Sequence, residues 1–197
     1  SNNPNLENLQ LSWNNLSSLD VSNNPLLTYL YVMSNQLTSL DVSQNAALTL
    51  LYCDTNNLIS LDIRNNALLT DLICASNNLE ILNIKNTNNI NFSTISAGWW
   101  SMMPNGYSHP GFNATNNPNL NCINVDDNTW ANTNWTVVND NIDAQHYFGG
   151  FCTPQTNIPD NNFEAFLEAN GMGNGVLGDD SVSTIHIDTV ISLSLSG

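Results

Sequence analysis

Apolar and polar positions alternate in a fixed phrase over the first part of the chain. The phrase LxxLxLxxN, with Val, Ile or Cys at its third apolar position, occurs eight times between Leu6 and Thr87, where Thr87 replaces the last Asn. Its starts alternate at 10 and 11 residues, so the full period is 21. The phrases begin at Leu6, Leu16, Leu27, Leu37, Leu48, Leu58, Leu69 and Leu79. A fixed period of this length indicates a solenoid, in which stacked coils bury one continuous core.

Each half of the period predicts a strand followed by a turn. In Leu9-Gln10-Leu11 the two leucines have the spacing of two that is typical of a strand. The Asn that ends a phrase, such as Asn14, suits a turn because its amide can bond nearby backbone groups. We therefore expect short parallel strands on both sides of the solenoid, joined by turns whose Asn side chains form ladders.

The third apolar position of the phrase points to one family. Leu51-Tyr52-Cys53 and Leu72-Ile73-Cys74 carry Cys there, and Leu61-Asp62-Ile63 carries Ile. These residues resemble the leucine-rich repeat family, in particular its short 21-residue bacterial class (IRREKO-type), over residues 4–87. The resemblance implies a β-rich solenoid with short parallel strands on both faces, in a secreted or cell-surface bacterial protein. Cys53 and Cys74 are expected to be buried apolar thiols.

The repeat pattern divides the rest of the chain. We expect residues 1–128 to form the solenoid, interrupted at 97–115 by an aromatic insertion, and residues 129–152 to form a C-terminal cap. Cys122 and Cys152 lie outside the repeat register, and a disulfide between them would staple this cap by about 3–4 kcal/mol. Residues 153–158 read as a linker. Residues 159–197 are expected to hold an amphipathic cap helix and the first strands of a further solenoid unit.

The two ends of the sequence resemble one interior join. Leu195-Ser196-Gly197 would lead into Ser1-Asn2-Asn3-Pro4, much as Val21-Ser22 leads into Asn23-Asn24-Pro25. This favours one unit of a tandem-repeat surface protein, or of a head-to-tail fibre in which copies of the chain meet end to end. An arbitrary boundary of the sequence is the alternative.

Charge limits the classes of partner. The chain has two basic and 17 acidic residues, and its formal net charge is −15. Nucleic acid and anionic membrane surfaces would repel such a chain. No apolar run approaches the roughly 20 residues of a membrane-spanning helix.

Outward positions of the first-half strands carry aromatic residues. Because neighbouring coils lie about 4.8 Å apart, the sequence predicts one exposed patch there. The patch consists of Trp13, Tyr29, Tyr31, Met33 and Tyr52, and the insertion adds Trp99, Trp100 and Tyr107. Such a surface suits a glycan or a surface protein, whereas packing between neighbouring strands is the structural alternative.

No catalytic or cofactor motif accompanies these patterns, so a non-enzymatic protein without a cofactor is expected. A column of carboxylates and an oxygen-rich loop are Ca²⁺ candidates, although the repeat itself explains the column. These residues are Asp20, Asp41, Asp62, Asp179 and Asp180. Glycosylation signals occur at Asn15, Asn91, Asn113 and Asn134, and at Ser181 and Thr189. The sequence predicts an extracellular structural or adhesive module, or alternatively a glycan- or protein-binding module.

Overall fold

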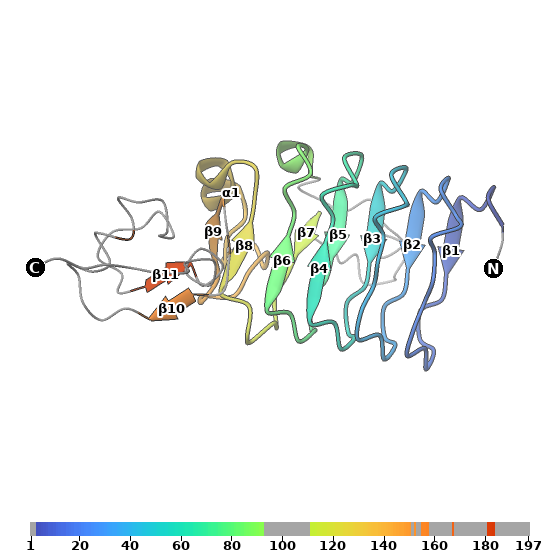
Figure 1. Cartoon of the computed structure of the whole chain (residues 1–197), viewed down its shortest axis with the longest axis horizontal. Coiled ribbons are helices and arrows are strands. Elements are labelled where there is room, and N and C mark those ends of the chain that lie inside the picture. The colour runs from blue at the N-terminus through green and yellow to red at the C-terminus, as the bar shows by residue number, and fades with distance from the viewer. Residues whose placement is uncertain are drawn as a thin grey trace, which may run out of the picture. The chain divides into compact units, whose positions relative to one another are not determined.

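The computed structural model describes residues 3–92 and 111–150, together with residues 152, 155–157, 167 and 181–183. The chain divides into two compact units, Ser1–Gly150 and Phe151–Gly197. The first unit is the solenoid, and its coils follow one another in a row (Figure 1).

One short strand from each coil contributes to the first parallel sheet, here called sheet A. Leu9 lies opposite Leu30, and Leu30 lies opposite Leu51, which is the predicted register of 21 residues. The strands of sheet A, in their order across it, are β1 (Asn8–Gln10), β2 (Tyr29–Tyr31), β3 (Leu50–Tyr52), β5 (Asp71–Ile73) and β7 (Phe112–Asn113).

From the third coil onward, a second parallel sheet, here called sheet B, forms on the other side of the solenoid. The equivalent segments 19–21 and 40–42 of the first coils are not strands. The strands of sheet B are β4 (Ser60–Asp62), β6 (Ile81–Asn83), β8 (Cys122–Asn124) and β9 (Tyr147–Gly149). The prediction of a β-solenoid with parallel strands on both faces is therefore confirmed.

The inward side chains of both sheets form one continuous core. Leu30, Leu51 and Leu72 are fully buried in successive coils of sheet A. Cys53 and Cys74 occupy the next inward position, where they are buried and free, as predicted. Burial raises the pKa of both thiols well above the ordinary value. They are therefore apolar packing groups rather than nucleophiles.

Buried asparagines tie each coil to the one before it. The Nδ2 of Asn77 donates to the carbonyl of Cys53 in the preceding coil (3.1 Å) and of Cys74 in its own (3.1 Å). Its Oδ1 accepts from the backbone N–H of Leu58 (3.0 Å). Equivalent bonds are made on the same side by Asn35, Asn56 and Asn117, and a second ladder contains Asn24, Asn45, Asn66 and Asn86. The predicted ladders are thus present.

The predicted insertion 97–115 ends earlier than expected. Phe112 pairs with Leu72 in sheet A and is fully buried, and Ala114 occupies the inward position of the same coil. Asn117 then continues the ladder of Asn77. Residues 111–115 are therefore a strand and turn of the solenoid, which the pattern missed because Phe and Ala replace Leu and Cys. Residues 93–110, with Trp99, Trp100 and Tyr107, lie outside the described residues.

The C-terminal end of the first unit combines a helix and a strand. Helix α1 (Asn128–Asn134) is capped at its N-terminus by Asp127, whose Oδ1 accepts hydrogen bonds from the backbone N–H groups of Thr129 (2.9 Å) and Trp130 (3.0 Å). A short 3₁₀ helix, η1 (Asn89–Asn91), follows β6 in the chain. The predicted cap is partly solenoid, because β9 extends sheet B within it. Cys122 and Cys152 form the predicted disulfide.

The second unit is described only in parts. Strand β10 (Gln155–Asn157) pairs antiparallel with β11 (Ser181–Ser183). The segment expected to be a linker, residues 153–158, therefore contains a strand. Of the predicted cap helix only Leu167 is described, and it is helical and buried.

None of the helices within the described ranges is long and apolar enough to cross a membrane.

Candidate binding face on sheet A

The outward face of sheet A changes character along the solenoid. Its outer positions are occupied by Asn8 and Gln10 on β1, and by Tyr29 and Tyr31 on β2. On β3 and β5 the same positions hold Leu50, Tyr52, Asp71 and Ile73. The first two strands leave these side chains exposed or partly exposed, whereas those of the next two are buried.

The buried part, here called the outer cluster, comprises Met33, Leu50, Tyr52 and Ile73. Tyr52 is fully buried, and the ring of Tyr31 meets it edge to face at a centroid distance of 5.4 Å. The prediction that Met33 and Tyr52 belong to an exposed patch is therefore wrong. Their apolar contacts within this second cluster explain why their side chains are not available at the surface.

The exposed part lies on the first two coils. Trp13 is 55% exposed and Tyr29 is 42% exposed, although both are large apolar groups. Trp13 has a positive φ of 56°, and its N–H donates to the carbonyl of Met33 (3.0 Å). Its backbone is thus held against the second coil while its side chain remains at the surface. We call Trp13, Tyr29 and Tyr31 the aromatic face.

A small hollow opens beside the aromatic face. It has a volume of about 170 Å³ and is lined by Gln10, Ser12, Trp13, Tyr31 and Met33. Its lining contains no charged side chain. Ser12 Oγ is buried and makes no hydrogen bond in the described structure. Burial raises the pKa of Tyr31, with smaller contributions from Tyr29 and Asp71, so its hydroxyl stays neutral at physiological pH.

Ser12, Met33 and Asp54 occupy the same position in three successive coils, 21 residues apart. Burial raises the pKa of Asp54 to about 6, and hydrogen bonds from its own backbone and from the Thr55 side chain oppose this shift. Its Oδ1 is buried without a hydrogen bond, and the Thr55 hydroxyl lies 3.4 Å from Oδ2. The sequence gives no hint of this shift, because Asp54 stands at a variable outward position of the phrase.

Asp54 should make stability depend on pH. The folded state holds the proton up to about pH 6, whereas the unfolded chain releases it near 3.8, so stability falls as the pH rises through this window. Asp54→Asn should raise the free energy of unfolding by about 2–3 kcal/mol at pH 7.5 and change it little at pH 3.5. Urea unfolding at both pH values measures this difference. An equal effect at both would contradict it, and the exposed Asp140→Asn serves as control.

The Asp carboxylates on the side of sheet B form hydrogen bonds or ion pairs with residues two positions further along the chain. Asp20 Oδ1 accepts from Ser22 N (2.9 Å) and Ser22 Oγ (2.7 Å), and Asp41 Oδ1 accepts from Ser43 N (2.9 Å). These bonds lower the pKa of Asp20 and of Asp41. Asp62 forms an ion pair with Arg64, Oδ2 to Nη2 at 2.7 Å.

No three His, Cys, Asp or Glu side chains within the described ranges could hold a metal ion together. The carboxylates of Asp20, Asp41 and Asp62 each have a local partner two residues further along the chain. Asp179 and Asp180 lie outside the described residues.

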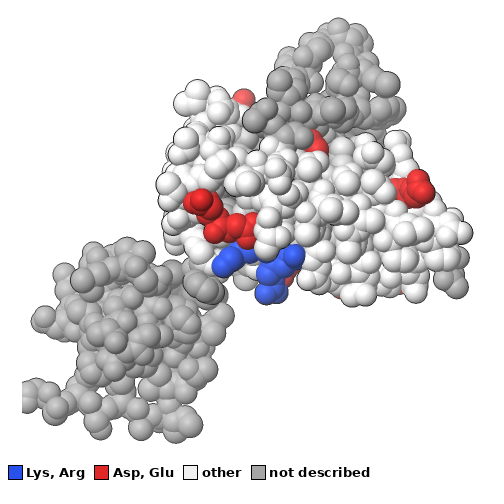
Figure 2. Space-filling model, turned by 90° about the horizontal axis from the view of Figure 1, so that it is seen from above, with Lys and Arg blue, Asp and Glu red and all other residues white. Residues whose placement is uncertain are grey.

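A second hollow of about 440 Å³ lies beside this column, lined by residues that include Ser39, Asp41, Ser60, Asp62 and Arg64. It has no aromatic side chain, and its basic group is already paired with Asp62. On the face seen in Figure 2 nearly all described residues are uncharged, and the blue basic groups lie next to red acidic ones. The hollow on sheet A therefore offers the more specific set of contacts, because it combines rings with neutral polar groups.

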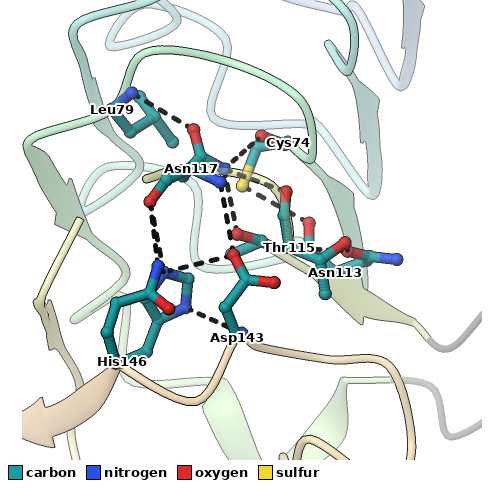
Figure 3. Close-up of polar contacts among 9 residues, drawn as sticks. Cys74, Leu79, Asn113, Thr115, Asn117, Asp143 and His146 are labelled. Carbon is teal, nitrogen blue, oxygen red and sulfur yellow. Dashed lines mark hydrogen bonds and ion pairs between the residues drawn. The ribbon is translucent and has the colours of Figure 1, made fainter. Parts of the chain in front are cut away.

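His146 forms a buried polar cluster with Asp143 and Asn117 (Figure 3). Its Nδ1 accepts the backbone N–H of Asp143 (3.3 Å), and Nε2 faces the carbonyl of Asn117 at 3.5 Å and Asp143 Oδ2 at 3.8 Å. Burial lowers the pKa of His146, which favours the neutral form of the ring. The His146 side chain is fully buried, so this His–Asp pair joins the C-terminal end to the Asn ladder rather than contacting a substrate.

The candidate glycosylation sites differ in their exposure to solvent. Asn15 and Asn91 are exposed, and Asn134 is exposed on α1. Asn113 is buried in β7, and its Oδ1 accepts from Thr115 N (2.9 Å) and Thr115 Oγ1 (2.7 Å), so it is unavailable to a glycan. Ser181 begins β11, and Thr189 lies outside the described residues.

Comparison with known proteins yields one partial likeness. No protein-family model matches the chain, and no curated protein matches it in sequence. A solved structure, the functional domain of InlJ from Listeria monocytogenes, which includes a cysteine ladder, is 34% identical with a TM-score of 0.43. The match covers 62% of this chain and 25% of that one. At this TM-score the likeness is limited, and the architecture above rests on the residues of this chain alone.

Proposed function

We propose that the protein is a non-enzymatic recognition module of the cell surface or the extracellular space, which binds its ligand through the aromatic face of sheet A. The observation that carries this proposal is the exposure of two aromatic side chains in adjacent coils, Trp13 in the turn after β1 and Tyr29 on β2. Large exposed rings on a rigid β-surface are typical of contact sites, where Trp and Tyr contribute most of the binding energy.

The rigidity of the underlying sheet supports the proposal. The backbone N–H groups of Leu11 and Trp13 donate to the carbonyls of Tyr31 (2.8 Å) and Met33 (3.0 Å). The ring of Tyr31 packs against the buried Tyr52. A ligand would therefore meet a preformed surface and would not need to order a loop, which limits the entropic cost of binding.

An extracellular setting has separate support. The disulfide between Cys122 and Cys152 is typical of proteins that mature in an oxidising compartment. The chain carries a net charge of −15, which disfavours nucleic acid as a ligand. The tandem-repeat or end-to-end fibre arrangement remains a prediction from the sequence, because residues 1–2 and 184–197 lie outside the described residues.

An array of extracellular glycans and matrix proteins tests the proposal directly. The purified chain should be retained by at least one component, and Trp13→Ala with Tyr29→Ala should weaken that binding at least about 30-fold. Tyr147→Ala is the matched control, because Tyr147 is a 49% exposed aromatic residue on sheet B. Equal binding by the double variant, or an equal loss with Tyr147→Ala, would contradict the proposal.

A further inference from the structure

The structure assigns a ligand class to the hollow beside the aromatic face: we propose that it binds a single uncharged sugar ring, stacked on Trp13 and hydrogen-bonded by Ser12 and Gln10. This inference rests on the proposed recognition function and adds its chemistry. The first step is size. The hollow of about 170 Å³ is smaller than the roughly 300–1,000 Å³ of sites for drug-sized ligands, so it suits one ring of a larger glycan.

The second step is the chemistry of the walls. Trp13 and Tyr31 supply aromatic surface, and Met33 supplies an apolar floor that is 3% exposed. The C–H groups on one face of a pyranose ring are apolar and pack against an aromatic ring, whereas its hydroxyls point outward around the edge. A flat aromatic wall with polar groups at its rim therefore complements a sugar ring better than it complements an aliphatic side chain.

The third step is the state of the polar groups. Ser12 Oγ has no hydrogen-bond partner although it is buried, which carries a free-energy cost that a ligand hydroxyl would relieve. Rotation of the serine side chain between staggered positions can turn Oγ toward an incoming group. Gln10 is exposed at the rim on β1 and offers both a donor and an acceptor.

The fourth step is charge. Gln10, Ser12, Trp13, Tyr31 and Met33 carry no charge, and the raised pKa of Tyr31 keeps its phenol neutral. A carboxylate or phosphate would find no basic partner there, because the only basic residues of the chain are Arg64 and Lys85. Arg64 is paired with Asp62, and Lys85 Nζ donates to the carbonyl of Gly150 (3.0 Å). A neutral hexopyranose or N-acetylhexosamine fits these conditions, whereas an acidic sugar does not.

The test is saturation-transfer NMR on the full chain with separate methyl glycosides of glucose, galactose, mannose and N-acetylglucosamine. At least one should bind, with a dissociation constant in the millimolar range that is ordinary for a single exposed subsite. Trp13→Ala should weaken binding at least about tenfold, and Trp13→Phe should retain most of it because a ring remains. Ser12→Ala should weaken binding about fivefold without lowering the thermal midpoint, because it removes an unpartnered buried hydroxyl.

Ser39→Ala is the matched control, since Ser39 lines the hollow beside the Asp column on the other side of the solenoid. Unchanged sugar binding by the Trp13 and Ser12 variants, or a loss with Ser39→Ala, would overturn the assignment. Array binding that depends on Trp13 and Tyr29, but that none of the four glycosides competes, would overturn the sugar assignment and leave the recognition function standing.

Discussion

Asn56→Asp should destabilise the solenoid by about 3–5 kcal/mol at pH 7, because it replaces a buried donor by a carboxylate that faces carbonyl oxygens. Nδ2 of Asn56 donates to the carbonyls of Val32 (2.9 Å), Cys53 (3.1 Å) and Asp54 (3.3 Å). An aspartate Oδ2 in this place would lose all three contacts and meet repulsion instead. The remaining Oδ1 could still accept from Leu37 N, as the Asn does at 3.0 Å.

Urea unfolding followed by far-ultraviolet circular dichroism measures this loss. The adjacent Asn57→Asp is the matched control, because Asn57 is exposed and the same substitution should change stability by less than about 0.5 kcal/mol. The loss at position 56 should also shrink at pH 4, where a buried carboxyl of raised pKa regains its proton. A loss below about 1 kcal/mol at pH 7 would show that the ladder is not a main source of cohesion between coils.

Trp135→Ala should cost a similar amount, about 3–5 kcal/mol, by opening a cavity at the end of the core. The Trp135 side chain is 4% exposed, and its ring centroid lies 4.3 Å from that of Phe112 and 5.7 Å from that of Phe148. It also meets Phe92 (5.5 Å) and Trp130 (5.2 Å) edge to face. Trp135 thus joins β7 and β9, which belong to opposite sheets, to the segment after α1.

Thermal and urea unfolding of Trp135→Ala and Trp135→Phe measure this contribution. The Phe variant keeps a ring and should lose less than about 2 kcal/mol. Val138→Ala, at a residue that is 91% exposed and three positions away, should be neutral. Losses that are equal for Phe and Ala at position 135 would mean that packing volume is not what Trp135 contributes.

Regular features of the fold were predictable because they repeat. Leu30, Leu51 and Leu72 share one inward position. The pattern of one coil therefore predicts burial at the same position of the next coil. The Asn ladders follow for the same reason. Phe112 was missed as a strand residue because it keeps the inward position but changes the residue type, and a pattern search sees only the type.

Features that depend on three-dimensional surroundings were less accessible. Tyr29 and Tyr52 stand at neighbouring outward positions of the same sheet, and the sequence treats them alike. One is 42% exposed and the other is fully buried in the outer cluster. The raised pKa of Asp54 has the same origin, since burial on an outward face cannot be read from the phrase itself. Local pairs such as Asp20 with Ser22 lie only two residues apart, yet the phrase does not show which neighbouring hydroxyl the carboxylate accepts from.

The central claim is that the aromatic face of sheet A is the ligand-binding surface. Hydrogen–deuterium exchange of the full chain, with and without a saturating ligand from the array, tests it most directly. We expect added protection at residues 8–14 and 29–33, which carry and support Trp13, Tyr29 and Tyr31. Protection confined to residues 60–65 and 81–85 on the side of sheet B, with none at the first two coils, would contradict the claim.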